Sequence, residues 1–235
     1  MEIHRFIAEM ERIAPPELAD AYDEGRIGLV VEGSPDISRV CCALDATPAV
    51  VGEAIRSGAE MLVVHHTPLW TPVTSVRGGI AALLRDTLAA GLNIYVMHSN
   101  FDHAAEGIND TLGGLLSLGE MVEMSLGVVG SCTLPLSGIA GRLGCPLRVY
   151  GSFSPPVRLA VVGGSGFSPD LMEEAASLGA DCFLSAELKH SVCRSTTLTL
   201  IEATHYALES PGMRRLADRM GWTFLDDPPR MVSVR

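Results

Sequence analysis

The segment EAIRSGAEMLVV at residues 53–64 is repeated in similar form at residues 174–185, which read EAASLGADCFLS. In both segments a helical pattern stops at a glycine, Gly58 or Gly179, and an acidic residue and an apolar run follow. Upstream of each copy, a hydroxyl residue and a proline form a typical helix start: Thr47-Pro48 and Ser168-Pro169. The two segments therefore predict the same helix–strand unit at two places in the chain.

The strand that follows is repeated as well. Residues 94–102 read IYVMHSNFD and residues 201–209 read IEATHYALE, and each copy ends in a histidine, three residues and a carboxylate. Matches that recur in the same order indicate two strand–helix–strand repeats, which we expect to be related by a pseudo-dyad. The fold class that this predicts is α/β.

Short apolar runs separated by helical patterns support layers of strands and helices. The expected strands are 28–31, 40–44, 61–64, 94–97, 159–162, 182–184, 198–201 and 231–234, and residues 3–13 read as an amphipathic helix. Residues 125–156 are rich in Gly, Ser and Pro. We therefore expect a first lobe at 1–124, a connecting segment at 125–156 and a second lobe at 157–235.

Composition narrows the class of protein. The 235 residues are 47% hydrophobic and 19% charged, with a mean hydropathy of +0.27, so the chain can bury a core. A net charge of −11 and a pI of about 5.0 argue against binding to nucleic acid or to an anionic membrane. No secretory signal is recognisable, and the longest uncharged stretch, 125–140, is too short and too rich in Gly to span a bilayer. A soluble, cytoplasmic protein is expected.

The six cysteines form no CxxC pair. Cys41, Cys42 and Cys182 lie in apolar runs, which favours buried thiols in a reducing compartment. A redox site or a cysteine-based metal site is the alternative.

The sharpest chemical signal is His65-His66, directly after the run MLVV. Adjacent residues of a strand point to opposite faces, so two neighbouring imidazoles can serve one site only where the strand ends. Thr67-Pro68 supplies a turn at that point. Surface or core histidines without a ligand are the alternative interpretation.

The repeated strand ends add His98 with Asp102, and His205 with Glu209. A spacing of four places each pair on one helical face. Imidazoles and carboxylates together suit Zn²⁺, Mn²⁺, Fe²⁺ or Co²⁺, and two bridging carboxylates suit a pair of ions. Capped, hydrogen-bonded polar groups at strand ends are the alternative. Lys189-His190, after Glu187, is either a solvated pair or a contact to a substrate.

Four segments resemble one known family. They are ALDATPAVVGEAIRSGAEMLVVHHTPLW, HSNFDHAAEGINDTLGGLLSLG, and ADCFLSAELKH followed by EATHYALE. They are similar to the motifs of the Nif-three-like proteins, whose bacterial members are called dinuclear metal centre proteins or GTP cyclohydrolase I type 2 homologues. The resemblance covers nearly the whole chain.

The resemblance implies a fold of two interlocked α/β repeats with a dinuclear metal site between them. Its five ligand positions correspond to His65, His66, Asp102, His205 and Glu209, with the two carboxylates as bridging groups. It also implies two divalent transition-metal ions per chain, which the sequence does not distinguish among Zn, Fe, Mn, Co and Ni. A toroidal homohexamer is common in the family.

Two functions of different class follow. The first is a hydrolase that uses a metal-bridging hydroxide on a nucleotide or another phosphorylated small molecule, with GTP cyclohydrolysis as the activity that the family label suggests. His98 and His190 match further positions near the metal cavity and are the candidate proton donors. The second is a non-catalytic metal-binding or regulatory scaffold. Trp70 and Phe101 are expected to shape the substrate pocket, and Tyr22 stands where a Trp is common in the family.

Overall fold

The computed structural model describes residues 1–232, and its contacts divide the chain into two compact units. Unit 1 comprises residues 1–105 and 213–235, and unit 2 comprises residues 106–212. The boundary at 212/213 falls inside helix α8 (His205–Met220). Among the described residues, no helix combines the length and the apolar composition that crossing a membrane requires.

Unit 1 contains a five-stranded sheet with the order β1-β4-β3-β2-β11. Its strands are β1 (Gly28–Val31), β2 (Val40–Asp45), β3 (Met61–His66), β4 (Asn93–Val96) and β11 (Thr223–Phe224). The four strands from β4 to β11 are parallel, and β1 is antiparallel to β4. Parallel strands need crossover connections, which α2 (Pro48–Ser57) and α3 (Gly78–Ala89) supply.

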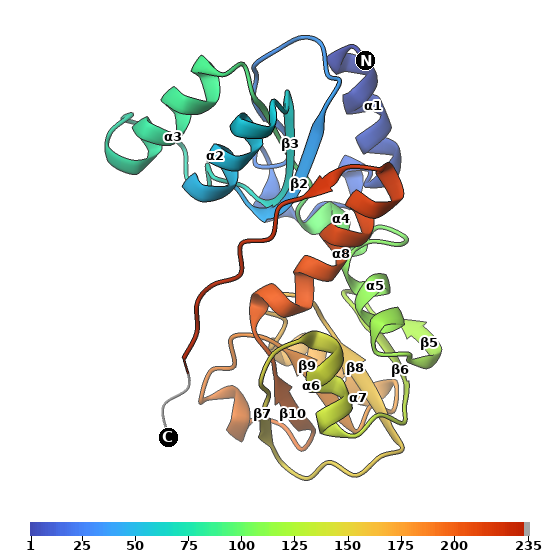
Figure 1. The fold of residues 1–235 in the computed structure, drawn as a ribbon. Helices are drawn as coiled ribbons and strands as arrows, with labels where there is room; N and C mark the ends of the chain where they lie inside the picture. Colours follow the sequence, from blue (N-terminus) through green and yellow to red (C-terminus); the bar gives the residue numbers. More distant parts are fainter. Residues whose placement is uncertain (233–235) are drawn as a thin grey trace. The chain divides into compact units, whose positions relative to one another are not determined.

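Both faces of this sheet are covered, which explains the continuous apolar runs of its strands. Leu62 and Val64 pack with residues of α2 and α3 in one core cluster. On the other face, Tyr95 contacts Phe6 of α1 (Ile3–Ile13) edge to face. Figure 1 shows α2 and α3 on one side of β2 and β3, and α1 on the other.

Unit 2 contains a six-stranded sheet with the order β5-β6-β8-β9-β10-β7. Its strands are β5 (Gly119–Glu123), β6 (Val128–Cys132), β7 (Arg148–Tyr150), β8 (Val157–Val161), β9 (Cys182–Ser185) and β10 (Thr199–Glu202). The three strands from β8 to β10 are parallel, β6 and β7 run antiparallel to them, and β5 runs antiparallel to β6.

Helices cover both faces of this sheet as well. α7 (Pro169–Ser177) packs Met172 and Ala175 against one face. On the other face lie α5 (Ile108–Leu115), α6 (Leu136–Leu143) and the first turns of α8.

The repeat predicted from the sequence is confirmed by the order of the strands. In unit 1 an antiparallel strand, β1, pairs with the third strand of the series β2, β3, β4, and in unit 2 β7 pairs with the third strand of the series β8, β9, β10. Both predicted helix starts are also found. Thr47 Oγ1 accepts from the Val50 amide at 3.1 Å, and Ser168 Oγ accepts from the Leu171 amide at 3.2 Å.

The contact-based units divide the chain differently from the expected lobes 1–124, 125–156 and 157–235. Residues 125–156 contain β6, α6 and β7, so they belong to the sheet and one helical layer of unit 2. The strand expected at 231–234 is absent at 231–232, and 233–234 lie outside the described residues. The edge strand of that part of the chain is β11 instead.

The predicted buried thiols are confirmed. Cys41, Cys42 and Cys182 are at most 1% exposed, and all six cysteines are free. Burial raises the pKa of Cys182 to about 11. A thiol with such a pKa stays protonated at neutral pH and is a poor nucleophile or metal ligand.

Candidate metal centre

His65 and His66 end strand β3, where the parallel strands of unit 1 expose their carboxyl ends. The buried, parallel position of β3 fixes the backbone up to His66, and the turn that follows lets both rings approach each other. Their centroids lie 4.9 Å apart. The two adjacent imidazoles therefore share one side of the unit, as the position of the strand end predicts.

His98 joins them from the end of β4. It is the N-cap residue of the short helix α4 (Ser99–His103), and its ring lies 4.9 Å from that of His65 and 5.6 Å from that of His66. One nitrogen of each of these three histidines lies within 4.8 Å of the others, so the group could hold a metal ion. Asp102, on α4, approaches the same group, with Oδ1 3.6 Å from His65 Nε2.

In each histidine of this group, Nδ1 forms a hydrogen bond with an oxygen. The acceptor is the Met97 carbonyl for His65 at 2.7 Å, Asp45 for His66 at 2.8 Å, and Asp23 for His98 at 2.8 Å. An oxygen of this kind only accepts, so Nδ1 carries the proton and the neutral ring keeps its lone pair on Nε2. Metal-bound histidines typically have this arrangement, because the second contact fixes the tautomer and the orientation of the ring.

Unit 2 carries a second set at the start of α8. His205 and Glu209 are one turn apart, and His205 Nε2 lies 2.9 Å from Glu209 Oε2. Glu209 is only 3% exposed. His205 Nδ1 contacts Glu187 Oε1 at 2.7 Å, so this histidine repeats the pattern of unit 1.

Glu187 holds that position with a left-handed backbone, at φ 62°. A non-glycine residue with positive φ costs free energy, and such residues cluster at functional sites. The neighbouring Leu188 amide donates to Glu202 Oε1 at 3.0 Å, which ties this turn to β10. The strained turn therefore places the Glu187 carboxylate against His205.

The donor set fits a divalent metal. A deprotonated Nε2 and a carboxylate oxygen repel each other at these separations unless a proton or a cation lies between them. Ligand atoms bonded at about 2.1 Å to one ion are about 3.0–3.5 Å apart. The distances of 3.6 Å for His65 and Asp102, and of 2.9 Å for His205 and Glu209, lie near that range.

A glycine of unit 2 makes room for Glu209. A Cβ added at Gly164 would lie 2.3 Å from Glu209 Oε1 and 3.4 Å from His205 Nε2, and Gly164 has φ +63°. The backbone after β8 therefore passes too close to these two side chains for any other residue to fit without displacing them. This glycine belongs to the Gly-Gly-Ser-Gly turn of residues 163–166, which leaves space for the Glu209 carboxylate.

Of the histidines predicted as proton donors, only His98 lies in this cluster. His190 is exposed in the turn after β9, and among residues 1–232 the groups close enough to share a metal ion do not include it. Three carboxylates that contact the histidines were not predicted as site residues: Asp23, Asp45 and Glu187. Asp45 and Glu187 lie within the segments that resemble the family, but no pattern in the sequence indicates their histidine partners.

Asp23 is the most deeply buried of these carboxylates. It is fully buried, and besides His98 it accepts from the Ser99 amide at 3.0 Å and from the Ser99 hydroxyl. Tyr22, its neighbour in the 3-10 turn η2 (Ala21–Asp23), is half exposed. Partial burial, together with the negative charge of Asp20, raises the pKa of the Tyr22 phenol above its ordinary value. The phenol therefore stays neutral at neutral pH.

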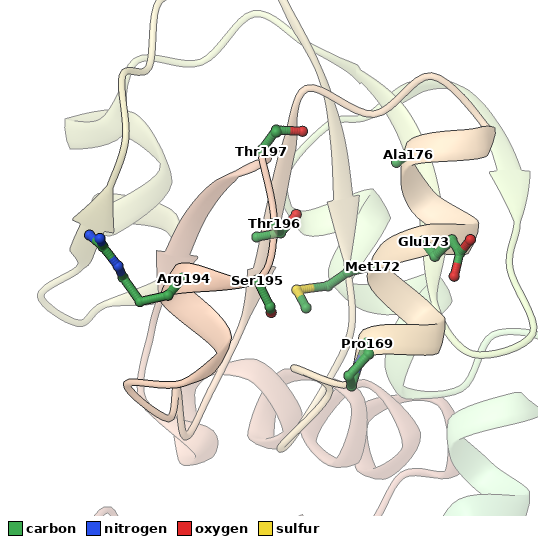
Figure 2. Close-up of a pocket in the computed structure, with 8 residues that line it drawn as sticks. All are labelled: Pro169, Met172, Glu173, Ala176, Arg194, Ser195, Thr196 and Thr197. Atoms are coloured by element: carbon green, nitrogen blue, oxygen red, sulfur yellow. The ribbon is translucent and has the colours of Figure 1, made fainter.

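Unit 2 also has a pocket of about 490 Å³ between α7 and residues 194–197. In Figure 2, Met172 points into it from α7 while the Arg194 side chain points away. Its hydroxyls are engaged within their own loop, since Ser195 Oγ donates to the Val192 carbonyl and Thr196 Oγ1 accepts from the Leu198 amide. None of the candidate metal residues lines this pocket.

Comparisons with known proteins identify relatives of this chain. The family model described as Duf34/NIF3 (NGG1p interacting factor 3) matches residues 1–227. A protein of Pyrococcus horikoshii named "GTP cyclohydrolase 1 type 2 homolog" is 33% identical, with 97% of each chain covered. A protein of the same name from Escherichia coli K12 is 30% identical over 94% of this chain and 97% of its own.

The fold is also similar to solved structures. "Reduced HcgD from Methanocaldococcus jannaschii" gives a TM-score of 0.82 at 26% identity, covering 95% of this chain and 96% of that one. A structure titled "protein ybgI, unknown function" gives 0.88 at 27% identity, covering 97% and 99%.

Proposed function

The chain belongs to the Duf34/NIF3 family, and from this premise we propose that it is a metal-dependent hydrolase with a dinuclear centre. One observation carries the proposal. Three histidines, His65, His66 and His205, each place Nδ1 on an oxygen acceptor and keep Nε2 to bind a metal. Surface or core histidines do not need three such second contacts.

The proposed ligands are His65, His66 and Asp102 from unit 1, and His205 and Glu209 from unit 2. We propose that these residues would hold two divalent transition-metal ions per chain, with Asp102 and Glu209 as the groups that the family resemblance implies to be bridging. Three observations support this proposal: the short histidine-to-carboxylate distance within each unit, the deep burial of Glu209, and the space that Gly164 leaves for the Glu209 carboxylate. Nitrogen and oxygen ligands of this kind suit Zn, Fe, Mn, Co and Ni alike.

When bound, such ions would lower the pKa of a coordinated water toward about 7 and polarise the substrate. The protein's own residues then have separate tasks. Asp45 and Glu187 hold His66 and His205 in one tautomer. Asp23 orients His98, which lies beside the proposed ligands without being one of them.

His98 is therefore our proposed proton donor to the leaving group. His190, in the exposed turn after β9, is proposed as a second donor. We propose a nucleotide or another phosphorylated small molecule as substrate, supported by the name "GTP cyclohydrolase 1 type 2 homolog" of the relatives. A cytoplasmic homohexamer is also proposed, since all six cysteines are free thiols and the family resemblance implies that assembly.

The test is the metal content of protein purified without a metal-affinity column, measured by elemental analysis beside Asp102→Ala and Glu209→Ala. We expect about two transition-metal ions per chain, lost in both variants, since each would remove a bridging group. Asp110→Ala is the control, because Asp110 lies in the first turn of α5 and accepts from the Glu106 amide. Protein that binds no metal after incubation with Mn²⁺, Fe²⁺ or Zn²⁺ would refute the ligand assignment.

Turnover separates the hydrolase from the alternative of a metal-binding scaffold. The loaded protein should hydrolyse at least one member of a panel of nucleotides, phosphate esters and cyclic amidines, and Asp102→Ala should not. A loaded protein that is inactive on the whole panel would favour the scaffold.

A further inference from the structure

Two exposed aromatic rings stand next to the histidine group of unit 1. Tyr22 in η2 is 50% exposed, and Trp70 in the loop after β3 is 48% exposed. Among residues 1–232, the only other exposed aromatic side chain is Tyr150, at 40%. Large rings are usually buried, so two neighbouring exposed rings beside a candidate centre need an explanation.

The two rings, here called the aromatic pair, come from separate segments and meet at His98. Their centroids lie 6.4 Å apart. The ring of Trp70 lies 5.5 Å from that of His98, and the ring of Tyr22 lies 6.1 Å from it, both in edge-to-face geometry. A planar group resting on the pair would therefore reach the histidine group with its substituents.

Trp70 is held in place before any ligand arrives. Arg26 Nε donates to the Trp70 carbonyl at 2.7 Å, and the Arg26 guanidinium carbon lies 5.2 Å from the centre of the Trp70 ring. The cation over the ring and the bond to the backbone fix both the side chain and its loop. A rigid exposed ring loses little conformational entropy on binding, which favours its use as a stacking platform.

We propose that the aromatic pair binds the planar ring of the substrate and selects for (hetero)aromatic compounds with an anionic group, such as nucleoside monophosphates. This proposal rests on the proposed function, because the anionic group is assigned to the metal centre. Arg26 adds positive charge beside the pair in a chain whose net charge is −11. Phe101, predicted to shape the pocket, is fully buried, so Trp70 is the ring of those two that a ligand can reach.

The chain offers a direct readout, because it has only two tryptophans. Trp222 stacks on Phe6 with centroids 5.7 Å apart, so Trp222→Phe keeps an aromatic contact and leaves Trp70 as the sole indole. The probes are guanosine 5′-monophosphate, adenosine 5′-monophosphate and uridine 5′-monophosphate, with ribose 5-phosphate as the ringless counterpart. Titrations use metal-loaded protein and protein treated with chelator.

We expect the nucleotides to quench Trp70 fluorescence and ribose 5-phosphate not to. Trp70→Ala and Tyr22→Ala should each weaken nucleotide binding about tenfold, measured by calorimetry in the otherwise unchanged chain, as is typical for the loss of one stacking ring. Tyr22→Phe should bind like the parent, and so should Tyr150→Ala, the matched control on β7. Metal content should be equal in all of these variants.

The results separate this proposal from the proposed function. Ring-dependent quenching that persists after chelation supports the aromatic pair even if the metal assignment fails. Equal affinity for ribose 5-phosphate and the nucleotides, no ring-dependent quenching with any nucleotide, or equal affinities of Trp70→Ala and Tyr150→Ala would each overturn it.

Discussion

At the scale of single residues, the candidate centre depends on the oxygens behind its histidines. Glu187 is the clearest case, because a strained backbone at φ 62° places its carboxylate 2.7 Å from His205 Nδ1. Glu187→Gln keeps the shape and, through its amide oxygen, an acceptor, but removes the charge that favours the metal-binding form of the ring. We expect metal affinity to fall about 10–100-fold with little change in the melting temperature.

A competition titration against a metal-binding dye would measure this change. Glu173→Gln is the matched control, since Glu173 is exposed on α7, away from His205 in the sequence and outside the histidine contacts. Equal metal affinity of Glu187→Gln and Glu173→Gln would show that the Glu187 contact is incidental.

The residue scale also separates what the sequence could predict from what it could not. His65-His66 and the His–x3–carboxylate pairs could be recognised because their members are neighbours along the chain. Asp23, Asp45 and Glu187 reach their histidines across 75, 21 and 18 positions, and no local spacing links partners that far apart. Only the folded sheet brings them together.

At the scale of secondary-structure elements, one carboxylate links the residues that precede two parallel strands. Glu60 precedes β3, and its Oε2 accepts from the Arg39 amide at 2.8 Å and from the Ser38 amide at 3.1 Å, just before β2 begins. Partial burial alone would raise the pKa of Glu60, but the hydrogen bonds from Arg39 and Ser38 outweigh it and lower that pKa.

Because the pKa of Glu60 is lowered in the folded state, its contribution to the free energy of unfolding depends on pH. The bonds stabilise the fold fully above the unfolded-state pKa of about 4.3, and this stabilisation is lost as the pH falls through the lower folded-state pKa. Glu60→Gln should therefore lower the free energy of unfolding by about 1 kcal/mol at neutral pH, a modest value because the group is largely solvent-screened. The difference from the parent should shrink on acidification.

Urea denaturation at neutral pH and near the acid limit of folding would measure both values. Glu17→Gln, an exposed carboxylate of the 3-10 turn η1 (Pro16–Leu18), serves as the control and should show no such convergence. If the free energy of unfolding of Glu60→Gln lay below that of the parent by the same amount at every pH, the ionised carboxylate would be ruled out as the stabilising form.

The same scale explains which strands could be predicted. The central strands are buried on both faces, so they appear as continuous apolar runs in the sequence. The outer strands β5 and β7 are mostly exposed, with Val122 and Tyr150 open to solvent, and such strands carry no run of this kind. Residues 125–156 contain β7 and also β6 (VVGSC), which is mostly buried but whose apolar run is interrupted by Gly130 and Ser131. For these reasons the segment reads as a connection although it contains two strands of unit 2.

At the scale of the whole molecule, unit 1 is discontinuous, because residues 213–232 return to residues 1–105. A two-residue strand and half of a helix make this return, and neither gives a strong pattern in the sequence. Their contacts are nevertheless buried: Cys42 Sγ contacts the Met213 carbonyl at 3.4 Å, and the Leu225 amide donates to the Cys42 carbonyl at 2.8 Å. The second half of α8 therefore completes the core of unit 1.

Leu216, which is 1% exposed on this part of α8, tests that assignment. Leu216→Ala removes a buried side chain and should lower the free energy of unfolding by about 2–5 kcal/mol. If the segment belongs to the core of unit 1, hydrogen exchange should accelerate at the amides of β2 and β3 and change little at those of β8 and β9. Asp218 is two residues further along α8 and exposed, so Asp218→Ala should leave exchange in both pairs of strands unchanged. Faster exchange in β8 and β9 alone would instead assign the whole of α8 to unit 2, because the local loss of protection follows the core from which the side chain was removed.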